Sequence, residues 1–144
     1  MHSHAEKIVI FLCCSSEDCA RFTGHLREEK LSNEVRLVTE ARDLVGALDQ
    51  LPPPRARALV ILDTGLENAW DAFDALRASH LKAVPVLAIC EPEESAAAYV
   101  RGVNAVLPRE HWEKNFGSTA ARLTAFWLQL VHLPETPSKG KSQA

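Results

Sequence analysis

The sequence predicts a doubly wound α/β fold with five parallel strands and five helices. Residues 7–13, 58–63 and 84–90 are nearly continuous apolar runs, which are typical of strands buried on both faces of a parallel sheet. Segments with apolar residues at helical spacing lie between these runs. This alternation of strand and helix indicates right-handed crossover connections.

Length and composition indicate one globular domain. The 144 residues suffice for a single core, and 47% apolar residues, 24% charged residues and a net charge of −3 are ordinary values. No basic surface indicates nucleic acid or anionic lipid, and no segment approaches the ~20 consecutive apolar residues of a membrane span. Because a signal-peptide pattern is also missing, we expect a cytoplasmic protein that binds neither nucleic acid nor membranes.

The first third of the chain predicts two strands and a helix. After the strand at 7–13, hydroxyl and acidic residues at 15–18 favour a helix N-terminus, and the helix is expected to run to about residue 30. Residues 34–38 then alternate at first between apolar and polar side chains, which suits a half-covered edge strand.

A second helix and the central strand follow. Prolines at 52–54 end the helix, whose apolar face is formed by Leu44, Val45, Leu48 and Leu51. The strand at 58–63 ends in a single carboxylate, Asp63. In open α/β sheets the carboxyl ends of the strands face the ligand crevice, so Asp63 is the first candidate for a functional residue.

The second half of the chain repeats the pattern. A core-facing helical stripe is expected from Trp70, Phe73 and Leu76. The strand at 84–90 and a helix at 93–101 come next, followed by a short strand at 105–107 and a last helix at about 110–133. The Pro/Ser/Lys tail at 134–144 is predicted to be disordered.

The strand order that fits best is the flavodoxin-like 2-1-3-4-5, because the edge-like second strand belongs outside. This order brings the ends of four strands round one crevice. The side chains predicted to meet there are Cys13, Cys14, Asp63, Cys90 and Arg109.

Three segments resemble the response-regulator receiver domain, a CheY-like fold. Residues 59–63 look like the strand that presents the phosphoacceptor aspartate, and 84–89 like the strand before the switch Ser/Thr. Residues 102–107 look like the segment that leads to the family's lysine. The resemblance covers about residues 7–133 and implies a role in a two-component phosphorelay.

The last predicted helix resembles one particular group of receivers. Its sequence at 126–134 is similar to stand-alone receivers that partner bacterial phytochrome kinases. The resemblance implies a sensor histidine kinase as partner and a homodimer through the face made by the fourth helix, fifth strand and fifth helix. On that face the candidate interface residues are Phe126, Trp127 and Leu130, which could equally pack the helix onto the sheet.

The chemistry departs from the family at most positions. Cys13 and Cys14 stand where the family has the acidic pair that binds Mg²⁺, and a neutral thiol is a poor ligand for that ion. Cys90 stands at the switch hydroxyl, and Arg109 replaces the lysine. Of this set only the phosphoacceptor equivalent, Asp63, is retained.

Two interpretations of Asp63 stay open. It could be a working phosphoacceptor, with Glu17 or Asp18 in place of the lost acidic pair and Mg²⁺ as cofactor. It could instead be a relic carboxylate that caps a loop or pairs with Arg109, with no cofactor.

The cysteines also allow alternatives. Cys13, Cys14 and Cys90 could form a thiolate metal site or a redox switch, or could simply be buried as small apolar residues. A cysteine-dependent phosphotransfer enzyme using Cys13 or Cys14 is a further alternative, although a Cys-x5-Arg phosphate loop is missing. We expect a pseudo-receiver that is not an enzyme and that acts by protein–protein contact.

Overall fold

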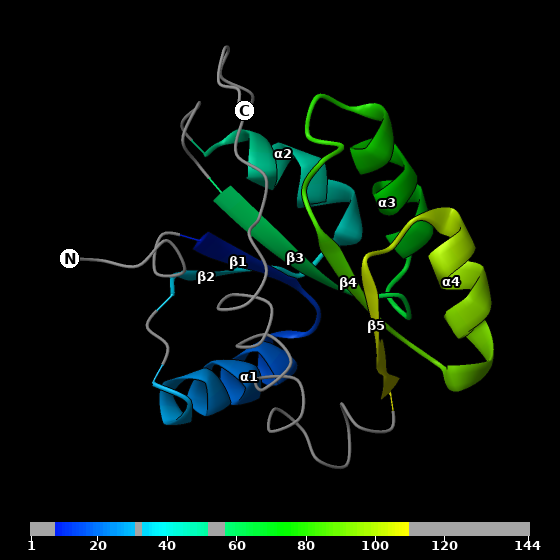
Figure 1. Ribbon diagram of the computed structural model, residues 1–144. Coiled ribbons are helices and arrows are strands. Elements are labelled where there is room, and N and C mark those ends of the chain that lie inside the picture. Colours follow the sequence, from blue (N-terminus) through cyan, green and yellow to red (C-terminus); the bar gives the residue numbers. More distant parts are fainter. Residues whose placement is uncertain (1–7, 31–32, 52–56, 110–144) are drawn as a thin grey trace, which may run out of the picture.

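The computed structural model describes residues 8–30, 33–51 and 57–109, and it confirms the predicted sheet. Five parallel strands lie in the order β2-β1-β3-β4-β5 (Figure 1). The strands are β1 (Ile8–Cys13), β2 (Val35–Val38), β3 (Arg57–Asp63), β4 (Val86–Cys90) and β5 (Ala105–Pro108). The predicted edge position of β2 is confirmed, and the order reverses between β1 and β3, where open α/β sheets place their ligand sites.

Four α-helices lie in the described part of the chain, two of them entered through a 3₁₀ turn. They are α1 (Ser16–Glu28), η2 (Ala41–Asp43) with α2 (Leu44–Asp49), α3 (Ala69–Ala78), and η3 (Pro92–Glu94) with α4 (Ser95–Arg101). The predicted fifth helix at 110–133, with Phe126, Trp127 and Leu130, and the predicted tail at 134–144 fall outside the described residues. None of the described helices is long and apolar enough to cross a membrane.

Helix α1 begins where the hydroxyl and acidic residues predicted. The Ser15 hydroxyl accepts a hydrogen bond from the Asp18 backbone N–H at 3.1 Å, which is a standard helix N-cap. Phe22 and Leu26 are fully buried against the sheet. The helix ends at Glu28, before the predicted residue 30, because Lys30 adopts a left-handed φ of 64° that cannot continue an α-helix.

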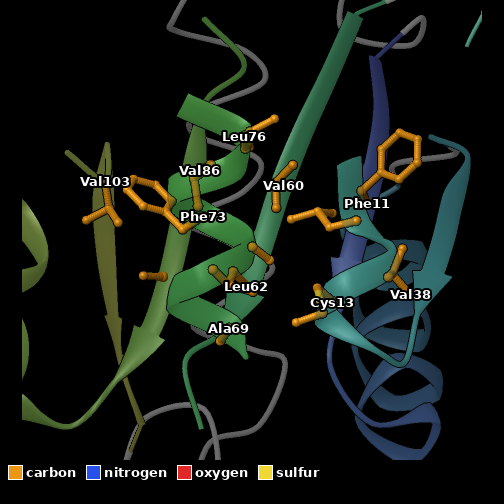
Figure 2. Close-up of a cluster of buried hydrophobic side chains, with 14 of the residues drawn as sticks. Phe11, Cys13, Val38, Val60, Leu62, Ala69, Phe73, Leu76, Val86 and Val103 are labelled. Carbon is orange, nitrogen blue, oxygen red and sulfur yellow. The ribbon is translucent and has the colours of Figure 1, made fainter. Parts of the chain in front are cut away.

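The sheet is covered on both faces. Helix α1 lies on one face, and α2, α3 and α4 lie on the other (Figure 1). Figure 2 shows the second layer, in which Phe73 and Leu76 of α3 pack over Val60 and Leu62 of β3. Phe73 and Leu76 of the predicted stripe are therefore core residues, whereas Trp70 is only partly buried. The guanidinium carbon of Arg101 lies over the Trp70 ring, 4.6 Å from the ring centroid.

Arg77 anchors the end of the sheet opposite the carboxyl edge. Its guanidinium donates to the Lys82, Val84 and Gly102 carbonyls and to Asn104 Oδ1 at 2.9–3.1 Å. The same Asn104 oxygen accepts the Val86 N–H at 2.8 Å. Burial lowers the pKa of Arg77. These contacts fix the entries to β4 and β5, so both strands deliver their carboxyl ends to the Asp63 edge in register.

Candidate functional site

Asp63 is the last residue of β3, and its carboxylate accepts two hydrogen bonds. Its Oδ1 accepts the Gly65 backbone N–H at 2.8 Å and Arg109 Nη2 at 2.6 Å. The side chain is 13% exposed, so the carboxylate is largely shielded from water. Asp63 thus both closes a tight loop and forms an ion pair, the two roles that the relic interpretation predicts.

Arg109 follows β5 and contacts acceptors at the ends of β3 and β4 and directly after β4. Besides Asp63, its Nη2 donates to the Ile89 carbonyl at 3.3 Å, and its Nε lies 3.1 Å from Glu91 Oε2 in a second ion pair. The arginine side chain is 17% exposed. One positive charge therefore serves two carboxylates, and these three side chains together carry a formal charge of −1.

The loop after β3 is held against the end of β4. The Ile89 carbonyl accepts both the Thr64 backbone N–H at 3.0 Å and the Thr64 hydroxyl at 2.9 Å. A Cβ at Gly65 would lie 3.2 Å from Arg109 Nη2 and 3.2 Å from Asp63 Oδ1. A larger side chain at position 65 would therefore crowd the ion pair, which lies close to the backbone here.

Cys13 ends β1 and Cys14 directly follows it, and the two side chains lie on opposite faces of the sheet. Cys13 lies in the layer beneath α2 and α3, with Val38 and Leu62 (Figure 2), whereas Cys14 faces α1. Both side chains are fully buried. Burial, with smaller contributions from Asp63 and Asp43, raises the pKa of Cys13 to about 12.

The other thiols are also held protonated. Burial raises the pKa of Cys14, with the Asp18 charge as the next cause. Burial likewise raises the pKa of Cys90, where Arg109 opposes the shift and Glu94 adds to it. Burial raises the pKa of Cys19 as well, although this residue is only partly buried. All four cysteines are free thiols that behave as neutral groups near pH 7.

This set of side chains does not suit Mg²⁺. Hard divalent cations take several oxygen ligands, but Asp63 is paired with Arg109, and the neighbouring β1 positions offer buried neutral thiols. Glu17 pairs with Arg21 at 3.4 Å on the exposed side of α1. Within the described residues, no group of three or more His, Cys, Asp or Glu side chains could hold a metal ion.

The structure brings together part of the predicted constellation. Asp63 and Arg109 are in direct contact, and Cys90 lies at the same sheet edge, one residue beyond the Ile89 carbonyl. Cys13 and Cys14 reach this edge but are buried in separate layers rather than lining an open crevice. Sequence reasoning missed Glu91, whose position directly after a strand at the same edge as Arg109 was the available signal.

The fold is shared with solved response regulators. The manganese-bound form of response regulator Rcp1 matches at 21% identity with a TM-score of 0.71, over 89% of this chain and 99% of that one. The bacteriophytochrome response regulator RtBRR matches at 24% identity with a TM-score of 0.62, over 89% and 84%. The phosphorylated cyanobacterial phytochrome response regulator RcpA matches at 18% identity with a TM-score of 0.72, over 90% and 99%.

These similarities establish the CheY-like receiver fold. They include phytochrome response regulators, in agreement with the resemblance found in the sequence. No family model matches the sequence, and no curated protein does. What the chain does with this fold must therefore be argued from its own site.

Proposed function

We propose that the chain is a pseudo-receiver of a two-component phosphorelay, acting by protein–protein contact rather than by accepting a phosphoryl group. The observation that carries the proposal is the ion pair between Asp63 and Arg109, with a 2.6 Å contact and both side chains less than one-fifth exposed. A carboxylate already paired with a guanidinium at 2.6 Å has less to gain from a metal ion.

The neighbouring positions support the same proposal. Phosphoryl transfer to a carboxylate relies on a cation that neutralises charge between donor and acceptor. At the end of β1 the chain offers Cys13 and Cys14, both buried and protonated. Cys90, also buried with a raised pKa, would be a weaker hydrogen-bond donor to a phosphoryl oxygen than a hydroxyl group.

Phosphorylation of Asp63 by a histidine kinase is the alternative. It is favoured by the place of Asp63 at the carboxyl edge of β3 in a fold shared with a phosphorylated response regulator. A cysteine-dependent phosphotransfer enzyme is disfavoured, because a nucleophilic thiolate needs a lowered pKa and access to substrate. Cys13 and Cys14 have raised pKa values and are fully buried.

The proposed contact surface is the exposed face of α4 beside β5. Tyr99 is 51% exposed and Val100 is 87% exposed, and both are large apolar or aromatic residues on α4. Exposed apolar residues of this kind favour contact with a second protein. We propose that the chain acts in the cytoplasm, forms a homodimer through this face together with the predicted helix at 110–133, and has a sensor histidine kinase as a further partner.

We predict that Val100→Asp converts the dimer into a monomer without unfolding the protein. A carboxylate buried at the centre of an apolar contact is unfavourable, whereas an 87% exposed position in the monomer tolerates it, with a change in the free energy of unfolding within about 0.5 kcal/mol. Sedimentation velocity gives the mass in each case. Ala20→Asp is the matched control on α1, which covers the other face of the sheet.

The control variant should sediment as the wild-type dimer. A wild-type monomer, or an equal loss of mass in both variants, would refute dimerisation through α4.

A further inference from the structure

Arg109 is shared by two carboxylates that belong to different parts of the fold. Its Nη2 contacts Asp63 Oδ1 at 2.6 Å, at the end of β3, and its Nε contacts Glu91 Oε2 at 3.1 Å, at the entry to η3 and α4. We infer that Asp63 and Glu91 compete for this one positive charge, so that the charge at Asp63 sets how firmly the start of α4 is tethered.

Glu91 is placed to pass such a change on to the helix. It is the N-cap residue of η3, and its backbone N–H donates to Glu94 Oε1 at 3.2 Å. Its carbonyl accepts the Glu94 N–H at 2.9 Å, which forms the first turn. The Glu91 and Glu94 side chains form a capping box around this turn, so a shift of the Glu91 side chain directly alters the turn that leads into α4.

The rest of α4 is held by contacts away from the site. The Tyr99 hydroxyl accepts the Val106 N–H at 3.2 Å, and Arg101 pairs with Asp74 at 3.5 Å. These anchors fix the middle and the end of the helix to β5 and α3. A change in the Glu91 tether should therefore loosen or tighten the first turn selectively.

The direction of the effect follows from electrostatics. When Asp63 loses its charge, more of the charge of Arg109 is available to Glu91, and the Glu91 contact strengthens. When Glu91 loses its charge, the tether is lost. Since Glu91 is 49% exposed, solvent screens the pair and the expected change is about two- to fivefold in a local opening equilibrium.

The inference rests on the proposed function only in treating α4 as the contact surface. It makes that surface sensitive to the charge of the Asp63 side chain. The coupling lies within one chain, so it can be measured without a partner in the Val100→Asp background that is expected to be monomeric.

The test is amide hydrogen exchange by NMR on the full chain, at the Glu94 and Ser95 amides, which donate to the Glu91 and Pro92 carbonyls. Asp63→Asn should slow exchange there by about two- to fivefold, and Glu91→Gln should accelerate it by a similar factor. The double variant should exchange like Glu91→Gln alone. Amides of α1 serve as the internal reference for changes in global stability.

Glu93→Gln is the matched control. It removes the same charge from the same exposed turn and so measures the contribution of the helix macrodipole. Equal acceleration by Glu93→Gln and Glu91→Gln would overturn the inference. Unchanged or faster exchange in Asp63→Asn would also overturn it. The same holds if Asp63→Asn still slows exchange in the double variant, where the Glu91 carboxylate is missing. Dimerisation measured with Val100→Asp is unaffected by these outcomes, so the two proposals fail separately.

Discussion

Replacing Cys13 with Glu and Cys14 with Asp lowers the free energy of unfolding by about 3–5 kcal/mol when no divalent metal is present, the scale of an uncompensated buried charge. Both thiols are fully buried, so the new carboxylates are placed among apolar side chains and close to Asp63. Urea titration measures the change. If loss of the acidic pair is what disables the metal site, Mg²⁺ should restore part of this stability.

The expected recovery is about 2.7 kcal/mol at a Mg²⁺ concentration 100 times the dissociation constant. The neutral variant Cys13→Gln with Cys14→Asn is the matched control, since it has similar bulk and no charge. Neither this control nor the wild-type protein should respond to Mg²⁺. If Mg²⁺ leaves the free energy of unfolding of the acidic variant unchanged, loss of the acidic pair is not what disables the metal site.

Arg109→Met should lower the free energy of unfolding by about 3 kcal/mol, because it leaves the shielded Asp63 carboxylate without its cation. Adding Asp63→Asn to Arg109→Met should recover much of that loss, because the uncompensated charge is then gone. Arg101→Met is the matched control. Its ion pair with Asp74 is more exposed, so a loss within about 1 kcal/mol is expected from the pair.

Urea unfolding of the four proteins measures these changes. Equal losses for Arg109→Met and Arg101→Met would show that the Asp63 pair is no stronger than a surface contact. A double variant less stable than Arg109→Met would contradict the role of the unpaired carboxylate.

The sheet could be predicted because its signal is local. Strands β1, β3 and β4 are nearly unbroken apolar runs, and such runs are typical of parallel strands covered on both faces. The edge position of β2 followed from its partial alternation. The exact end of α1 could not be predicted, since it depends on the left-handed backbone at Lys30.

The site was predictable only in part. Strand order alone places Asp63 and Arg109 at one edge, and their contact confirms that they are neighbours. The separation of Cys13 from Cys14 was within reach, because adjacent residues of an extended chain point to opposite faces. The Glu91 contact depends on which rotamers Arg109 and Glu91 adopt, and residue spacing carries no information about that choice.

We propose that Asp63, paired with Arg109, does not accept a phosphoryl group. Intact-protein mass spectrometry after incubation with acetyl phosphate and Mg²⁺, with Asp63→Asn in parallel, tests it most directly. We predict no phosphoryl adduct on the folded wild-type protein. An adduct that forms on the wild type and disappears in Asp63→Asn would contradict the claim and establish a working receiver.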